Sequence, residues 1–475
     1  MRTALALVLI TGLGGVSAWG VWQNELAPSP PSESSVEVQA ATPVLSVRRV
    51  PEALLRPRRD AAAAAAVVAL PERIPGDSCL VVTDQGRVLF EHEPATPLIP
   101  ASTQKLLVGA TLFELVDPDA TFETTVWSID PPVAGAITGD LWLVGGGDPL
   151  LATEPFVDRN GDQDRPHTRF EDLADAVVAA GIERIDGAVV GDGSRYDELR
   201  DVPSWLDRYR EQVSAGPLAG LTVNDGLVTF TPERVAVNPG VPAEDPAAHA
   251  AEVLTELLTE RGVVVGGGPT SGPVPAEASV LTSIESPSVQ TVVTQMVQWS
   301  DNTTAELLLK EIGVRARDEG STTVGGAAIL STMAAMGVRT EGLVIADGSG
   351  LDVGNRSTCQ ALTDLLDISG YDSALAGTLA VAGESGTLRN RLVDTPAEGR
   401  VLAKTGSLRH VTALAGFVEA DNDRVYTFAI MSNLGEGEFM PAAGGEVQDD
   451  LAVALAALPF VEVPSELEPL APRGR

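Results

Sequence analysis

Two residues near the start of a predicted helix have the types and the spacing for nucleophilic catalysis. Ser102 is followed three positions later by Lys105, and apolar residues recur at helical spacing after Pro100. This spacing places the lysine amine one turn from the serine hydroxyl, where a neutral amine could accept the hydroxyl proton. The helix N-terminus adds N–H groups that can stabilise an oxyanion. A serine N-cap followed by a surface lysine is the simpler explanation for this pair taken alone.

Lysine is scarce in this chain, and its scarcity favours the catalytic interpretation. Lys105, Lys310 and Lys404 are the only lysines, whereas lysine and arginine together number 32. Arginine therefore fills the surface roles, and arginine cannot act as a base near neutral pH. Two of the three lysines fall in short motifs that also contain serine or threonine.

The second motif, S-D-N, begins at Ser300 and lies in a predicted loop between two helical patterns. The first pattern begins at Ser288 and the second covers 303–312. Ser300 could relay a proton toward a leaving nitrogen, and Asn302 could hydrogen-bond both the lysine and a substrate amide. An Asx-type turn is the alternative explanation for this motif alone.

The third motif, K-T-G-S, precedes a predicted strand at 411–418. Lys404 supplies positive charge, Thr405 and Ser407 supply hydroxyls for a carboxylate, and Gly406 would let a substrate backbone approach the strand. The ordinary start of a strand is the alternative. S-x-x-K, S-D-N and K-T-G together form the signature of class A β-lactamases and penicillin-binding proteins, and the set is far more specific than any one motif.

The elements around these motifs follow two patterns. Two hairpins are predicted, one over 79–91 and one over 411–432, together with helices from Ser102 to about 117 and over 446–458. Residues 121–285 differ, because short β-like runs such as 141–144 and 188–190 alternate with Gly- and Asp-rich turns and one helical stretch at 246–261. This texture predicts an inserted module.

Composition excludes several other classes of protein. The 475 residues are 44% hydrophobic, which excludes a wholly disordered chain. Asp and Glu number 66 against 32 Lys and Arg, and the net charge of −34 repels nucleic acid and anionic membrane surfaces. The four histidines form no H-E-x-x-H, the two cysteines lack zinc spacing, and no G-x-S-x-G occurs. We therefore expect no metal and no organic cofactor.

One acidic segment alternates like a calcium-binding loop. Asp and Asn occupy positions 158, 160, 162 and 164. Gln163 stands where the loop needs glycine, and Arg169 stands where it needs glutamate. A solvated acidic loop is the prediction.

From about 61 to 463 the chain resembles the D-alanyl-D-alanine carboxypeptidase/endopeptidase family, the class C low-molecular-mass penicillin-binding proteins. Members carry an insertion between the first two motifs, and here 121–285 separates Ser102 from Ser300. A class A β-lactamase has these motifs much closer together and a deacylating glutamate loop that we do not find. Other family-like strings are L-V-G-G-G-D-P at 143–149, D-G-S-G-L at 347–351, G-T-L-R at 386–389 and L-A-G-F-V at 414–418.

The resemblance implies a mixed α+β/α/β fold, with a penicillin-binding/β-lactamase-like transpeptidase domain in which helices flank an antiparallel sheet. That domain would comprise 61–120 and 286–463, with a β-rich module of one or two subdomains at 121–285 and a tail at 464–475. The apolar run after Arg2 predicts a signal peptide or uncleaved anchor at 1–24, followed by a linker at 25–60. We therefore expect an exported, extracytoplasmic protein of the cell envelope.

The resemblance also implies a role for each motif residue. Ser102 would be the acylated nucleophile and Lys105 its general base, with Ser300 and Asn302 as proton relay and amide contact. Lys404, Thr405, Gly406 and Ser407 would bind substrate, and the N–H groups of Ser102 and Ser407 would form the oxyanion hole. Asp148 would bind the amine of the peptide side chain. The chain departs from the family at Asp352-Val353, where Ser-Arg is common, and at His410.

The expected activity is cleavage of peptidoglycan stem peptides, at the D-Ala-D-Ala end or at the D-Ala-diaminopimelate cross-link, with β-lactams as acylating inhibitors. The sequence leaves the choice between these two cleavages open, as well as the oligomeric state. A β-lactamase or related esterase is the rival enzyme, and a catalytically silent envelope-binding protein is the rival of another class. Cys79 and Cys359 could pair or remain buried thiols.

Overall fold

The computed structural model describes residues 50–159, 165–230 and 240–460. The predictions of a signal peptide or anchor at 1–24 and of a tail at 464–475 lie outside these residues, as do most of the linker and positions 160–164 of the acidic loop. Among the described residues, no helix combines the length and the apolar character that crossing a membrane requires.

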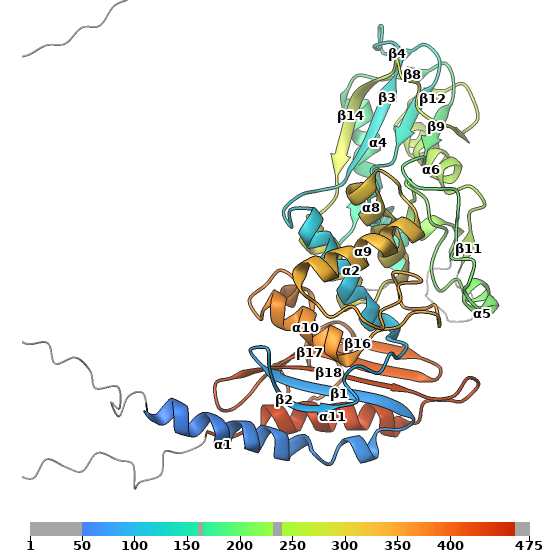
Figure 1. The fold of residues 1–475 in the computed structure, drawn as a ribbon. Coiled ribbons are helices and arrows are strands. Elements are labelled where there is room, and N and C mark those ends of the chain that lie inside the picture. The colour runs from blue at the N-terminus through green and yellow to red at the C-terminus, as the bar shows by residue number, and fades with distance from the viewer. Residues whose placement is uncertain (1–49, 160–164, 231–239, 461–475) are drawn as a thin grey trace, which may run out of the picture. The chain divides into compact units, whose positions relative to one another are not determined.

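A six-stranded antiparallel sheet is the centre of the part that carries the three motifs (Figure 1). Both predicted hairpins are confirmed, and the first and last strands of the chain meet where β1 pairs with β18. In sheet order the strands are β15 (Ala380–Val381), β16 (Val401–Leu408), β17 (Val411–Glu419), β18 (Val425–Asn433), β1 (Asp77–Asp84) and β2 (Arg87–His92).

Helices cover both faces of this sheet. Leu80 and Val82 of β1 pack in one apolar cluster with residues of α1 (Val50–Val67) and α11 (Ala442–Ala456). Cys79 and Val81, which point the other way because side chains alternate along a strand, join the cluster that contains α2 (Lys105–Leu115) and α10 (Cys359–Ser369). This explains why the inner strands read as continuous apolar runs.

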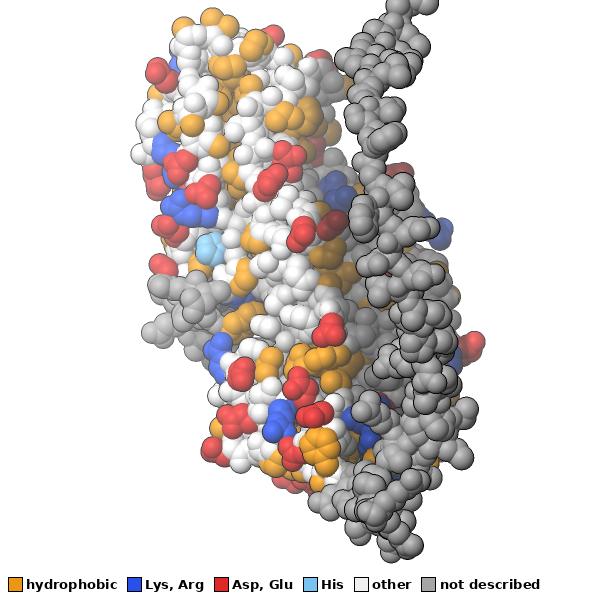
Figure 2. Space-filling view, turned by 90° about the vertical axis from the view of Figure 1, so that its left-hand side faces the viewer, with side chains coloured by type: hydrophobic (Ala, Val, Ile, Leu, Met, Phe, Trp, Pro, Cys, Tyr) orange, Lys and Arg blue, Asp and Glu red, His pale blue; other side chains and the backbone are white. Residues whose placement is uncertain are grey.

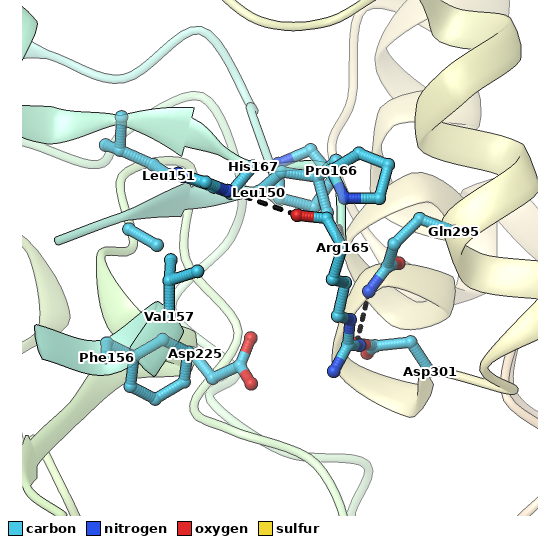
Figure 3. Close-up of a pocket in the computed structure, with 12 residues that line it drawn as sticks. Leu150, Leu151, Phe156, Val157, Arg165, Pro166, His167, Asp225, Gln295 and Asp301 are labelled. Carbon is cyan, nitrogen blue, oxygen red and sulfur yellow. Dashed lines mark hydrogen bonds and ion pairs between the residues drawn. The ribbon is translucent and has the colours of Figure 1, made fainter. Parts of the chain in front are cut away.

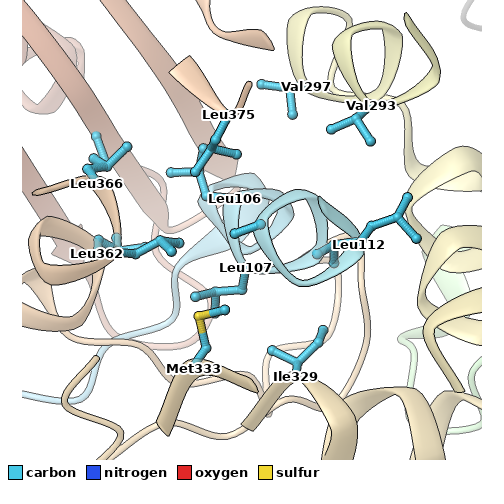
Figure 4. Packing of buried hydrophobic residues seen from close by; sticks show 14 of the residues in the cluster. Leu106, Leu107, Leu112, Val293, Val297, Ile329, Met333, Leu362, Leu366 and Leu375 are labelled. Atoms are coloured by element: carbon cyan, nitrogen blue, oxygen red, sulfur yellow. The ribbon is translucent and has the colours of Figure 1, made fainter. Parts of the chain in front are cut away.

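The helix that follows Ser102 is apolar around its whole circumference. Leu106, Leu107 and Leu112 leave α2 in different directions and are each fully buried (Figure 4). Their neighbours come from α10 and from α7 (Val289–Gln298), α8 (Asn302–Arg317) and α9 (Thr322–Met336). Packing on every side fixes the axis of α2 and therefore the position of Lys105 at its first residue.

Residues 123–285 form smaller sheets around a separate apolar cluster that includes helices α4 (Phe170–Ala179) and α6 (Pro246–Glu260). The five-stranded sheet has the order β13 (Thr270–Ser271), β9 (Val189–Asp192), β5 (Leu141–Val144), β3 (Glu123–Ser128) and β14 (Ser279–Glu285). In chain order the first and last strands of this sheet are β3 and β14, and they pair, with Glu123 opposite Glu285. The two ends of this region therefore meet.

Shorter elements complete the described chain. The three-stranded sheet is β12 (Val264–Val265), β8 (Arg184–Ile185) and β4 (Ala136–Ile137), and the two pairs are β6 (Leu151–Ala152) with β7 (Thr168–Arg169) and β10 (Leu227–Thr229) with β11 (Val241–Pro242). The short helices are α3 (Glu154–Arg159), α5 (Asp207–Glu211), η1 (Pro71–Arg73), η2 (Ala101–Gln104), η3 (Asn224–Gly226), η4 (Ala376–Thr378) and η5 (Gly386–Leu388).

Two sequence predictions need correction here. The linker does not extend to residue 60, because α1 begins at Val50 and contains Pro57. Ala63 and Val67 bury this helix against the sheet and Asp60 pairs with Arg87, contacts that outweigh the poor helical propensity of proline. The helix expected to begin at Ser102 begins at Lys105, after the 3₁₀ turn η2.

Cys79 and Cys359 form a disulfide that joins β1 to the first residue of α10. On the face drawn in Figure 2, basic side chains are scattered among acidic ones and form no continuous basic surface.

Candidate active site

Ser102, Lys105 and Asn302 meet at one point between α2 and α8. The Lys105 Nζ atom lies 3.1 Å from Ser102 Oγ, 2.9 Å from Asn302 Oδ1 and 2.6 Å from the carbonyl oxygen of Ser349. Residues from the first motif and the second motif are therefore in direct contact, although the whole of 123–285 separates them in sequence.

The partners of Lys105 determine where its lone pair points. Asn302 Oδ1 and the Ser349 carbonyl can only accept, so they take both N–H groups of a neutral amine. The Asn302 amide is held in this orientation because its Nδ2 atom donates to the Ser214 carbonyl at 2.8 Å. The remaining neighbour of the amine is the Ser102 hydroxyl, which can donate. In neutral Lys105 the lone pair is thus left for the Ser102 hydroxyl, whose other acceptor is the Ser349 carbonyl at 3.4 Å.

Burial makes the neutral form of Lys105 accessible. The side chain is fully buried, and this desolvation lowers the pKa of Lys105 to about 8, against the opposing effect of the carboxylates of Asp347, Glu306 and Asp301. A pKa in this range suits a general base near neutral pH.

The loop that supplies the Ser349 carbonyl is held by two buried carboxylates. Glu306 of α8 accepts from the N–H groups of Gly348 and Ser349, at 3.1 and 2.7 Å. Asp347 accepts from the Trp205 indole at 2.8 Å and from the N–H of Gly350 at 2.8 Å. Burial and the charge of Asp347 raise the pKa of Glu306 to about 8.

The sequence suggested no role for Glu306, and it suggested none for the D-G-S-G-L string at 347–351. A charged residue inside the apolar pattern of α8, four positions after Asn302, was the available signal for Glu306.

Backbone conformation around the nucleophile is tightly constrained. Ala101 and Ser300 are non-glycine residues in the left-handed region, with φ of 46° and 56°. Gly350, at φ 84°, approaches so closely that a Cβ atom there would lie 2.0 Å from the Ala101 carbonyl oxygen. A Cβ atom on Gly406 would lie 2.7 Å from the Pro100 carbonyl oxygen. The glycine of the third motif therefore allows β16 to pack against the turn that carries Ser102.

Asp301, between Ser300 and Asn302, has a structural role. It caps α8 by accepting from the Thr304 N–H at 3.0 Å, so the Asx-type interpretation also holds. Its other oxygen contacts Arg165 at 2.5 Å and Gln295 at 3.0 Å beside a small pocket (Figure 3). Burial acts to raise the pKa of Asp301, but the charge of Arg165 and the hydrogen bonds from Gln295 and Thr304 together outweigh it, and the pKa lies below its usual range.

The third motif lies on β16. Lys404 is fully buried and donates to the Thr405 carbonyl at 3.0 Å. Burial first, and the charge of Lys105 second, hold the pKa of Lys404 well below its usual value. The Thr405 hydroxyl donates to the Thr387 hydroxyl at 2.9 Å, and Ser407 is exposed.

Asp148 is not among the residues that hydrogen-bond to these groups. It is 5% exposed, and its Oδ1 accepts from the Leu150 N–H at 2.9 Å. Oδ2 and the Thr168 hydroxyl are both buried without a hydrogen-bond partner, although Thr168 lies near enough to Asp148 to lower the pKa of this carboxyl in part. Burial raises the pKa of Asp148 to about 6.

The lysine that belongs to no motif is also buried. Lys310 of α8 pairs with Asp197 and donates to the Leu199 carbonyl at 2.7 Å. Next to it, Glu311 accepts from Arg195 at 2.8 and 2.7 Å. These pairs join α8 to residues 195–199. No group of three or more His, Cys, Asp or Glu residues within 50–159, 165–230 and 240–460 is arranged to hold a metal ion.

The sheet order and the Ser102–Lys105 pair define the class of penicillin-binding, β-lactamase-like serine enzymes. The crystal structure of penicillin binding protein 4 (dacB) from Haemophilus influenzae has this fold, with a TM-score of 0.68 at 20% identity over 81% of this chain and 97% of that one. The chain belongs to the D-Ala-D-Ala carboxypeptidase 3 (S13) family, which it matches over residues 61–243 and 232–458.

Two curated relatives extend this comparison. A D-alanyl-D-alanine carboxypeptidase of Actinomadura sp. is 29% identical, covering 79% of this chain and 80% of the relative. Carboxypeptidase DacB of Mycolicibacterium smegmatis is 31% identical, covering 74% of each chain. The expected fold class and family are confirmed, and the protein is a serine peptidase.

Proposed function

We propose that this protein cleaves the D-Ala-D-Ala end of peptidoglycan peptides, the corresponding cross-link, or both, through an acyl-enzyme on Ser102. The observation that carries the proposal is the placement of the buried Lys105 amine, 3.1 Å from Ser102 Oγ and with its two other neighbours restricted to accepting. Names of the relatives and the family support the substrate class.

In the first half-reaction, Lys105 accepts the Ser102 proton while Oγ attacks the carbonyl carbon of the penultimate D-alanine. The N–H groups of Ser102 and Ser407 would stabilise the resulting oxyanion. The C–N bond then breaks, and the leaving nitrogen takes a proton from Lys105 through the Ser300 hydroxyl. Water repeats the sequence on the ester, releasing the peptide acid and restoring Ser102.

Lys404, Thr405 and Ser407 would bind the carboxylate of the leaving residue. An arriving carboxylate would raise the pKa of Lys404, so substrate binding itself favours the charged form of this lysine. Asp148 stays in the proposal as the group that binds the amine of the substrate side chain. Its support is the buried Oδ2 atom without a hydrogen-bond partner, which an ammonium group would satisfy.

We further propose that the protein is exported to the cell envelope, that β-lactams acylate it, and that 121–285 is an inserted module. The disulfide between Cys79 and Cys359 supports export, because such bonds persist in oxidising compartments. The apolar run at 1–24 supports a signal peptide or an anchor.

Mass spectrometry after incubation with a penicillin tests the proposal. We expect a long-lived adduct on the peptide that contains Ser102 and none in Ser102→Ala. Rapid loss of the adduct would favour a β-lactamase, and no adduct on the wild-type protein would favour a silent binding protein.

A further inference from the structure

We propose that Arg389 and Trp299 form a subsite for a second carboxylate of the leaving peptide, and thereby favour cross-linked peptides over free ones. This inference rests on the proposed function, since it extends the same site beyond the residue that is released.

The guanidinium of Arg389 is exposed and lies over the side chain of Trp299. Arg389 directly follows the 3₁₀ helix η5, and its guanidinium carbon lies 5.5 Å from the centre of the Trp299 ring. Within the described parts of the chain, Arg389 forms no ion pair with a carboxylate. In a protein with 66 acidic residues against 32 basic ones, an exposed arginine beside the site without an acidic partner is an available anion receptor.

Trp299 fixes this guanidinium next to the second motif. It directly precedes Ser300, the proposed relay to the leaving nitrogen. Arg165 also lies over the Trp299 ring, at 5.6 Å, but its charge is compensated by Asp301 at 2.5 Å. Of these two cations, only Arg389 remains to bind an external anion.

A hydrogen bond places η5 on the side of the leaving group. Thr387, two residues before Arg389, accepts from Thr405 at 2.9 Å, and Thr405 is a proposed ligand of the leaving carboxylate. Arg389 therefore lies near both segments that would hold the leaving residue, since it contacts Trp299 just before the second motif and Thr387 links η5 to β16. The carboxylate of the leaving residue itself would be bound by Lys404 and Thr405, so Arg389 is left for a further carboxylate.

The chemistry of the two substrates differs at this point. A carboxypeptidase releases free D-alanine, whose single carboxylate is taken up by Lys404 and Thr405. A cross-linked substrate releases a diaminopimelate residue that continues into a stem peptide with further carboxylates. A second, uncompensated cation can thus contribute binding only when the leaving group is a peptide.

Arg389→Gln tests the subsite by comparing kcat/KM for a cross-linked peptide dimer with that for a free pentapeptide. We expect the value for the dimer to fall about tenfold, the effect of one charge-assisted hydrogen bond, and that for the pentapeptide to change less than about twofold. Arg389→Lys should restore part of the difference. Wild type and Arg389→Gln should cleave a dimer with amidated leaving-chain carboxylates at equal rates.

Arg409→Gln is the matched control, because it removes an equal charge from an exposed arginine that lies over Phe439 directly after β16. An equal loss in this control, an equal loss for both substrates, or no loss would overturn the subsite. Penicillin acylation of Ser102 is measured in parallel in every variant. If wild type fails to acylate, the proposed function fails; if acylation persists and the substrate selectivity is unchanged, only the subsite fails.

Discussion

The Ser349 carbonyl oxygen lies closer to the Lys105 amine, at 2.6 Å, than the Ser102 hydroxyl does, at 3.1 Å. The base is therefore held by a main-chain group of a loop far from it in sequence. This carbonyl can only accept a hydrogen bond, so it takes one N–H of the Lys105 amine. The lone pair of the amine is then left for the Ser102 hydroxyl.

Replacing Lys105 by arginine separates the role of a base from the role of a charge. A guanidinium keeps the charge but has a pKa above about 12, so Lys105→Arg should acylate with penicillin roughly 10²- to 10⁴-fold more slowly. Lys404→Arg should be milder, since binding a carboxylate requires charge. Melting curves establish that both variants fold. Near-normal acylation by folded Lys105→Arg would contradict the general-base role.

The pKa of about 8 for Lys105 predicts how acylation depends on pH. Only the neutral amine accepts a proton, so the rate should fall with decreasing pH below about 8 and level off above it. Stopped-flow measurement of penicillin acylation between pH 5 and about 10 checks this, with a slope of about tenfold per pH unit on the acid side. A flat profile in the wild-type protein would exclude this lysine as the titrating base.

Gly350→Ala should disable the nucleophile without a change at any motif residue. A Cβ atom would lie 2.0 Å from the Ala101 carbonyl oxygen, and φ of 84° is itself unfavourable for alanine. We expect acylation to fall at least about a hundredfold, as misplacement by about 1 Å can do. Gly445→Ala, on α11 with nothing near the added methyl group, is the control and should leave the rate unchanged.

Breaking the ion pair between Arg195 and Glu311 should destabilise the protein more than breaking an exposed pair. Glu311 is fully buried and keeps Arg315 as a partner at 2.6 Å, so Arg195→Met removes the bidentate partner and should cost about 1.5–3 kcal/mol in the free energy of unfolding. Arg184→Met breaks an exposed pair with Asp186 and should cost at most about 1 kcal/mol. Denaturant titrations of the two variants give the comparison, and equal losses would contradict this assignment.

The disulfide predicts the outcome of thiol labelling. The denatured, unreduced protein should show no reactive thiol, and two should appear after reduction. The reduced protein should be less stable by about 2–5 kcal/mol, because the bond constrains a long segment of the unfolded chain. Two free thiols before reduction would contradict the pairing.

The strands and helices around the motifs could be predicted from sequence because they have strong apolar periodicity. The C-terminal end of α7 and the start of α8 could be predicted from the polar residues Ser300 to Asn302. Strands β17 and β18 could be predicted from two apolar runs that flank a turn. The start of α1 could not be predicted, since its stability comes from tertiary packing of Ala63 and Val67.

At the site, the motif residues could be predicted, but the contacts that orient them could not. Ser349 acts through its main-chain carbonyl, and Ser214 orients Asn302 in the same way, so neither contact depends on a recognisable side chain. We expected Gly406 to let a substrate backbone approach the strand. The structure shows that close packing against Pro100 already requires a glycine there. Backbone contacts between distant segments leave no local pattern in the sequence.

The burial of Lys105, Lys310 and Lys404 has a practical consequence for chemical labelling. Since these are all the lysines in the chain, the folded protein offers amine-reactive dyes and cross-linkers no lysine side chain on its surface. Such reagents would modify the α-amino group of the native protein and reach the three side chains only as the core opens. The extent of lysine modification would then report directly on the fraction of molecules in which the catalytic core has become accessible to solvent.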